Sequence, residues 1–143
     1  MSSLIKIESM INDFYKDLAE RIGRGDLHDM LIKFSQESLK RVESLNRVTQ
    51  LSTVEFSLEH ITGLKLEDYA LQVDRVIKDE RLDAVNKATT LESIMQELYS
   101  QASKKTIYAS PDASDLLERF SQESSKRKLK LLPLLQTSKT DRP

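Results

Sequence analysis

The sequence predicts an all-helical protein, because it has few helix breakers, a suitable charge balance and apolar residues at helical spacing. Its 143 residues include only three glycines and three prolines, whereas turn-rich β architectures need many more of both. Charged residues make up 31% and hydrophobic residues 38% of the chain, which suits helices with one buried stripe and solvated faces. This length fits one domain with one core.

The first part of the chain predicts an antiparallel helical hairpin over about residues 3–49. Apolar residues recur every three or four positions over 3–22, which indicates an amphipathic helix. Gly23 and Gly25 should end it, and Asp26 should cap a second helix. Because the loop is short, the two helices should lie antiparallel.

The rest of the chain predicts a crossover and a second hairpin. The stretch of about residues 50–82 has weaker periodicity and should cross the length of a bundle, with a short helix over 66–77. A third long helix is expected over 83–107. Ser110, followed by proline, should start the fourth helix, and Pro133 should end it.

An internal repeat links the two hairpins. The segment 34–41 recurs as 120–127 with seven of eight residues identical. The sequence therefore predicts a four-helix bundle of two related hairpins, the second over about residues 83–132. We expect one domain over 1–136, followed by a flexible tail over 137–143.

Glutamate and tyrosine recur on the first helix of each hairpin: Glu8 with Tyr15, and Glu92 with Tyr99. Duplicated hairpins with this spacing resemble the ferritin-like superfamily, and in particular rubrerythrin-type bundles. The resemblance implies inward-facing glutamates. In that family they join Glu-x-x-His motifs on the other two helices to hold a di-iron centre.

The second motif departs from the family pattern. Alignment on the apolar positions places Ser38 and Arg41, then Ser124 and Arg127, where the family has glutamate and histidine. A shift of one residue gives Glu37-x-x-Lys and Glu123-x-x-Lys instead. Guanidinium and ammonium groups are cations at neutral pH and are unsuited to metal ligation.

A degenerate di-iron site without metal is therefore the leading hypothesis, and we expect neither catalytic residues nor a cofactor. Each inward glutamate should pair with Arg41 or Arg127. Hydroxyl groups should meet the remaining hydrogen-bonding capacity: Tyr15, Tyr99, Ser38 and Ser124. The alternative is an iron-binding oxidoreductase of rubrerythrin type, with a carboxylate-rich site made of Glu8, Glu37, Glu92 and Glu123.

Composition excludes several other classes of function. With no cysteine, disulfides, zinc–thiolate sites, iron–sulfur clusters and thiol catalysis are excluded. His28 and His60 are isolated and are read as surface residues. The basic run Lys126–Lys130 is read as a solvated face near a helix C-terminus, and with a net charge of −1 no nucleic-acid partner is expected.

The expected cellular role is a structural or partner-binding module. No apolar run approaches membrane-spanning length, and the N-terminal residues lack a signal-peptide core, so neither a membrane contact nor a location outside the cytoplasm is expected. The family resemblance implies a homodimer, and three apolar residues outside the main stripes support it: Ile32, Leu39 and Leu129. Another protein partner stays open.

Overall fold

The computed structural model describes residues 3–51, 65–108 and 110–140, and its regular structure is entirely helical. It has helices α1 (Ser3–Ile22), α2 (Asp26–Leu51), α4 (Leu66–Lys78), α5 (Ala84–Thr106) and α6 (Pro111–Thr140). The all-helical prediction is thus confirmed over these residues. None of the helices described there combines the length and apolar character that a membrane crossing requires.

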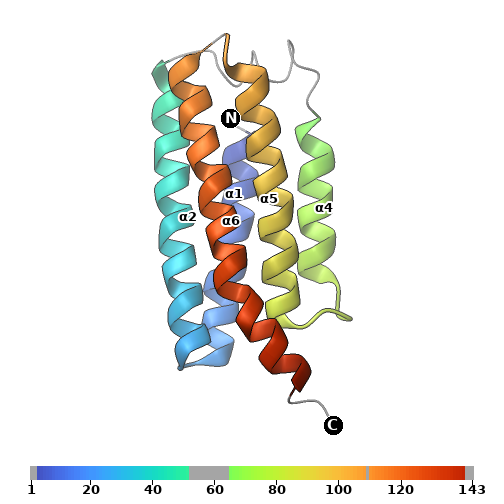
Figure 1. Cartoon of the computed structure of the whole chain (residues 1–143). Coiled ribbons are helices and arrows are strands. Elements are labelled where there is room, and N and C mark those ends of the chain that lie inside the picture. Colours follow the sequence, from blue (N-terminus) through green and yellow to red (C-terminus); the bar gives the residue numbers. More distant parts are fainter. Residues whose placement is uncertain (1–2, 52–64, 109, 141–143) are drawn as a thin grey trace.

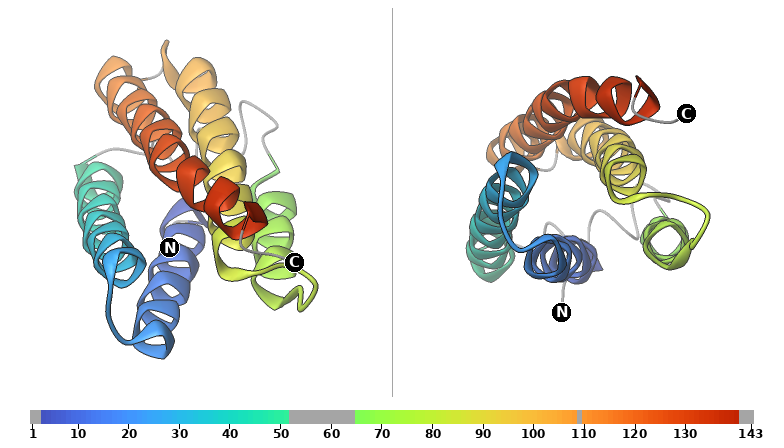
Figure 2. Two further views of the ribbon diagram at one scale, coloured as in Figure 1. Left: turned by 60° about the horizontal axis from the view of Figure 1, so that its bottom comes forward. Right: turned by 90° about the horizontal axis from the view of Figure 1, so that it is seen from below.

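The helices form two antiparallel hairpins, α1 with α2 and α5 with α6 (Figure 1). Helix α4 packs against α1 and α5, and it returns the chain along the molecule, so that α5 runs in the same direction as α2 (Figure 1). Viewed from below, α1, α2, α6, α5 and α4 follow one another around a shared interior (Figure 2). Residues 52–64 of the expected crossover lie outside the described residues.

Two glycines make the tight turn of the first hairpin possible. Gly23 has φ +84° and Gly25 has φ +111°, a backbone region that side chains with a Cβ rarely adopt. The N–H of Gly23 donates to the carbonyl oxygen of Ala19 at 2.9 Å and so closes α1. The predicted stop signal therefore works through backbone conformation.

The apolar stripes of the long helices form one continuous core. The largest fully buried apolar side chains include Ile7, Ile11, Phe34, Leu91, Met95 and Leu98. Charged and hydroxyl side chains are buried in the same interior, which is unusual for a helical core: Glu8, Ser38, Arg41, Glu92, Ser124 and Arg127.

The prediction that Pro133 ends the fourth helix is wrong, because α6 continues through this proline to Thr140. A proline inside a helix removes one backbone hydrogen bond and crowds the preceding turn. Beyond it, however, Leu134 and Leu135 pack against the core, and this packing favours continuation. Residues 137–140, expected in a flexible tail, belong to the helix, and 141–143 lie outside the described residues.

One apolar residue expected on the surface packs inward. Ile32 is half-buried and contacts the core, so it is not available to a partner as predicted. Leu39 and Leu129 are 49% and 64% exposed, in keeping with their expected position outside the main stripes.

Candidate functional site

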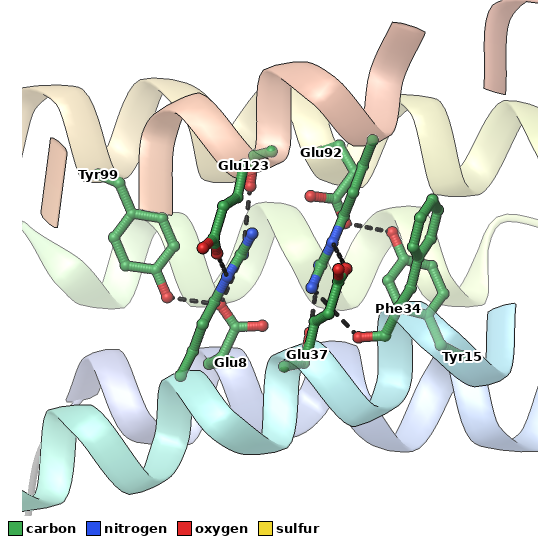
Figure 3. Close-up of polar contacts among 11 residues, drawn as sticks. Glu8, Tyr15, Phe34, Glu37, Glu92, Tyr99 and Glu123 are labelled. Atoms are coloured by element: carbon green, nitrogen blue, oxygen red, sulfur yellow. Dashed lines mark hydrogen bonds and ion pairs between the residues drawn. The ribbon is translucent and has the colours of Figure 1, made fainter. Parts of the chain in front are cut away.

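All eight side chains proposed for the degenerate site meet in the interior, two from each long helix (Figure 3). Helices α1 and α5 supply glutamate and tyrosine seven residues apart, which places both on one face after two helical turns. Helices α2 and α6 supply serine and arginine three residues apart, again on one face. We call this set the polar cluster: Glu8, Tyr15, Ser38, Arg41, Glu92, Tyr99, Ser124 and Arg127.

Each arginine forms an ion pair with the glutamate of its own hairpin. Nη1 of Arg41 lies 3.2 Å from Oε1 of Glu8, and Nη1 of Arg127 lies 3.2 Å from Oε2 of Glu92. The arginines are 1% and 2% exposed and the glutamates 0%. Four unit charges that sum to zero are thus held out of water, so each depends on its partner.

Each tyrosine donates to the glutamate of the other hairpin. The hydroxyl of Tyr15 donates to Oε2 of Glu92, and that of Tyr99 donates to Oε1 of Glu8 (Figure 3). The accepting oxygen is in both cases the one that also pairs with arginine. The tyrosines therefore tie the two hairpins together through charge-assisted hydrogen bonds.

The arginines also reach across to the opposite hairpin. Nη1 of Arg41 donates to Oγ of Ser124 at 3.2 Å, and its Nε donates to Oε1 of Glu123 at 3.1 Å. The second copy repeats the pattern, with bonds from Arg127 to Ser38 at 3.2 Å and to Glu37 at 3.3 Å. A guanidinium group has five N–H donors in a fixed plane, which suits it to several partners at once.

Aromatic rings enclose the guanidinium groups. Cζ of Arg41 lies 5.5 Å from the ring centroid of Phe120, and Cζ of Arg127 lies 5.1 Å from that of Phe34. A guanidinium group this close to an aromatic ring is attracted electrostatically. Phe34 and Phe120 come from the repeated segments, so the rings follow the same pseudo-symmetry as the ion pairs.

The ion pairs decide the protonation of the first glutamate. Burial alone would raise the pKa of Glu8, but the charges of Arg41 and Arg127 and the hydrogen bond from Tyr99 outweigh it and lower the pKa below 4.5. Burial lowers the pKa of Arg41, yet the charge of Glu8 outweighs burial and raises the pKa above the usual arginine value. The pair therefore stays ionised near neutral pH.

The two tyrosines stay protonated, because burial and the charge of the nearby carboxylate both disfavour the phenolate form. Burial, together with the charge of Glu92, raises the pKa of Tyr15 well above 10.0. Burial and the charge of Glu8 raise the pKa of Tyr99 in the same way. Both hydroxyls are consequently hydrogen-bond donors to carboxylates, and neither is a phenolate at neutral pH.

The residues that would hold a di-iron centre do not fit a metal here. All four candidate carboxylates, those of Glu8, Glu37, Glu92 and Glu123, accept hydrogen bonds from arginine. Among the described residues no three His, Cys, Asp or Glu side chains are grouped as ligands would be. Guanidinium groups bring positive charge to the carboxylate oxygens that a cation would need.

The sequence did not predict that Glu37 and Glu123, the outer glutamates, bind the buried arginines; it predicts for them only a possible role as metal ligands. Glu37 and Glu123 are 39% and 49% exposed and bond to the arginine of the opposite hairpin. Their spacing to Arg41 and Arg127 would suggest pairs within one helix. No sequence signal distinguishes this option from the observed pairs across helices, because both satisfy the same charges.

Of the two isolated histidines, His28 lies among the described residues. Nδ1 of His28 lies 2.8 Å from the carbonyl oxygen of Ala19, and the side chain is half-buried near the first hairpin turn, less exposed than expected. His60 lies outside the described residues.

Comparison of the chain with protein-family models, with curated proteins and with solved structures finds no match.

Proposed function

We propose that this chain is a ferritin-like scaffold in which an arginine–carboxylate network takes the place of a di-iron centre. Its role on this proposal is structural or partner-binding. The observation that carries the proposal is the position of the two guanidinium groups. Arg41 and Arg127 bond to Glu8 and Glu92, the residues that resemble the family's inward glutamates.

The chain direction supports the ferritin-like part of the proposal. In that architecture two antiparallel hairpins are joined by one long crossover, which makes the second and third long helices parallel. Helix α4 returns the chain along the molecule, and α2 and α5 run in the same direction (Figure 1). The repeated pattern of contacts in the polar cluster supports a duplicated hairpin.

The alternative is a di-iron oxidoreductase with a carboxylate-rich site. It would need Glu8, Glu37, Glu92 and Glu123 to release their arginine partners and turn to a metal. Losing those partners would leave two buried guanidinium groups beside two metal cations. The repulsion and the desolvation both oppose this arrangement, so we favour the scaffold.

Metal analysis tests the proposal directly. The protein would be purified from iron-supplemented culture, desalted, and measured for iron by elemental analysis and for ferroxidase turnover. We expect iron far below one atom per chain and turnover no higher than that of a buffer blank. Stoichiometric iron retained through desalting would overturn the proposal.

A gain-of-binding variant tests whether the polar cluster occupies the family's metal positions. Four substitutions restore Glu-x-x-His on both helices: Ser38→Glu, Arg41→His, Ser124→Glu and Arg127→His. This variant should bind iron, because two further carboxylates and two imidazoles then join Glu8 and Glu92. The matched control places the same Glu-x-x-His pattern at exposed positions of the same helices, with Lys33→Glu, Gln36→His, Arg119→Glu and Gln122→His, and should bind no more iron than the parent chain.

The partner-binding part of the proposal rests on exposed leucines, and we propose a second copy of the chain as the partner. Leu39 on α2 and Leu129 on α6 are 49% and 64% exposed. Contiguous exposed apolar patches mark sites of association, and the proposal is that these two leucines contribute to such a patch. Sedimentation of the parent chain should give a dimer, and Leu39→Ser with Leu129→Ser should give a monomer of unchanged stability. A monomeric parent chain would exclude the dimer.

A further inference from the structure

Three buried polar atoms of the polar cluster have no hydrogen-bond partner among the described protein groups: Oε2 of Glu8, Oε1 of Glu92 and Nη2 of Arg41. Two are acceptors and one is a donor. Buried polar atoms in folded proteins nearly always have a partner. A further partner is therefore expected among these three atoms.

The two unpaired oxygens face the middle of the cluster. In Figure 3 the carboxylates of Glu8 and Glu92 each use one oxygen for the dashed contacts, and the other is turned toward the opposite ion pair. Both side chains are fully buried, with 0% of their surface exposed. The unpaired positions thus belong to the interior and not to the solvated rim at Glu37 and Glu123.

The unpaired donor breaks the pseudo-symmetry of the arginine hydrogen bonds. Nη2 of Arg127 donates to the carbonyl oxygen of Phe34 at 3.1 Å. The equivalent nitrogen of Arg41 has no such partner, although Arg41 otherwise repeats the bonds of Arg127. The donor is therefore free on only one side of the cluster, the side of Arg41.

We propose that ordered water is bound inside the polar cluster, where it donates to Glu8 and Glu92 and accepts from Arg41. A water molecule can donate two hydrogen bonds and accept others, and buried waters typically make about three. A metal cation could bind the carboxylate oxygens but offers no acceptor to a guanidinium N–H. The four buried charges already sum to zero, so a neutral ligand keeps that balance.

The competing partners are the two serine hydroxyls. Ser38 and Ser124 each accept a hydrogen bond from an arginine, and each keeps its own proton to donate. Ser38 already lies close enough to the carboxylate of Glu8 for its hydroxyl to help lower the pKa of that group. A small rotation of each serine hydroxyl would direct its proton to a free carboxylate oxygen. That arrangement would satisfy the two acceptors without water, but it would leave Nη2 of Arg41 unpaired.

A high-resolution crystal structure of the full chain distinguishes these arrangements. We expect a well-ordered water about 2.5–3.0 Å from both free oxygens, or at that distance from one of them and about 2.7–3.2 Å from Nη2 of Arg41. Direct contacts from Ser38 and Ser124 to the carboxylates, with no solvent peak, would overturn the proposal. A peak about 2.0–2.2 Å from the oxygens would indicate a transition metal and would overturn the scaffold function as well.

Oxygen-17 relaxation dispersion of water in solution provides a second readout on the same protein. The parent chain should show at least one long-lived internal water. Glu92→Met, which replaces an acceptor by an apolar side chain of similar length, should lose at least one, whereas Glu123→Gln at the rim should lose none. No long-lived water in the parent chain, or equal numbers in the parent chain and Glu92→Met, would contradict the proposal.

Water in the polar cluster does not depend on a partner protein. Direct serine contacts would remove the water and leave the scaffold proposal intact, whereas a metal at this position would remove both. The two proposals can therefore fail separately.

Discussion

Two arginine side chains lie in the interior of this protein, 1% and 2% exposed, where charged groups are rare. Arg41, on α2, has partners on two other helices, namely Glu8 on α1 and Ser124 and Glu123 on α6. Lysine could not replace it, because an ammonium group is a point charge without the planar set of donors. Both positions therefore require arginine and would not accept lysine.

Removal of one arginine should be costly, because the paired glutamate is then buried without its counter-ion. Arg41→Leu should lower the free energy of unfolding by about 3–5 kcal/mol, measured by urea denaturation. The control is Arg47→Leu, an exposed position on the same helix, where a change within about 0.5 kcal/mol is expected.

A double-mutant cycle then measures the contact itself. Adding Glu8→Leu to Arg41→Leu should recover part of the lost stability, because no buried charge of that pair remains. Glu92→Leu combined with Arg41→Leu should show weaker coupling, since Glu92 bonds to the other arginine. Additive effects at Glu8 and Arg41 would mean that the two side chains do not meet.

The helix ends show how local sequence determines the elements around the cluster. The carboxylate of Asp83 accepts from the N–H of Asn86 at 2.8 Å and caps α5. At α6 the hydroxyl of Ser110 accepts from the N–H of Ala113 at 3.3 Å. Both residues satisfy a backbone donor that a helix N-terminus would leave free.

We expect the charged cap with the shorter bond to contribute more. Asp83→Ala should lower the free energy of unfolding by about 1–2 kcal/mol, and Ser110→Ala by about 0.5–1 kcal/mol. The carboxylate also interacts favourably with the positive end of the helix dipole. Urea denaturation of both variants shows which loss of stability is larger, and an equal or larger loss in Ser110→Ala would contradict the prediction.

At the scale of the molecule, the polar cluster is the interface between the two hairpins. The Glu8–Arg41 and Glu92–Arg127 ion pairs are each internal to one hairpin, whereas the bonds that involve tyrosine, serine and the outer glutamates run between hairpins. Neither hairpin can satisfy its buried charges alone. Separation of the hairpins should therefore expose charges and apolar surface together, which favours cooperative unfolding.

The free energy of unfolding should be greatest over a broad pH range around neutrality and should fall at both acid and alkaline pH. The pKa of Glu8 is lowered on folding, so its contribution is present above the unfolded value of about 4.5 and is lost as the pH falls through the folded value. The pKa values of Tyr15 and Tyr99 are raised. Their contribution is present below about pH 10 and is lost as the pH rises through the folded values.

Urea midpoints between about pH 3 and pH 11 test this profile. Tyr99→Phe should weaken the alkaline loss, because one of the two buried hydroxyls no longer titrates. Glu8→Gln should weaken the acid loss in the same way. Exposed carboxylates also titrate, so the comparison is between each variant and the parent chain. If the urea midpoint of Tyr99→Phe falls with rising pH as steeply as that of the parent chain, titration of this hydroxyl is not a cause of the alkaline loss.

Local sequence was sufficient for the helices and their turns. Apolar spacing, two glycines at positive φ and the caps at Asp83 and Ser110 act over a few residues, so they are readable from the chain. The repeat of 34–41 at 120–127 also indicated which charged residues belong together, because duplicated segments tend to occupy equivalent environments. The exception was Pro133, whose effect depends on distant packing.

Only the tertiary structure decided how the buried charges are paired. Glu8 bonds to Arg41 within one hairpin, whereas Glu123 bonds to the same arginine from the other hairpin. Opposite charge alone would also allow either arginine to pair with any of the four glutamates. Likewise, α6 continues past Pro133 because Leu134 and Leu135 pack against the core. The physical reason is common to both: these energies depend on distances and angles between helices, which no local stretch of sequence determines.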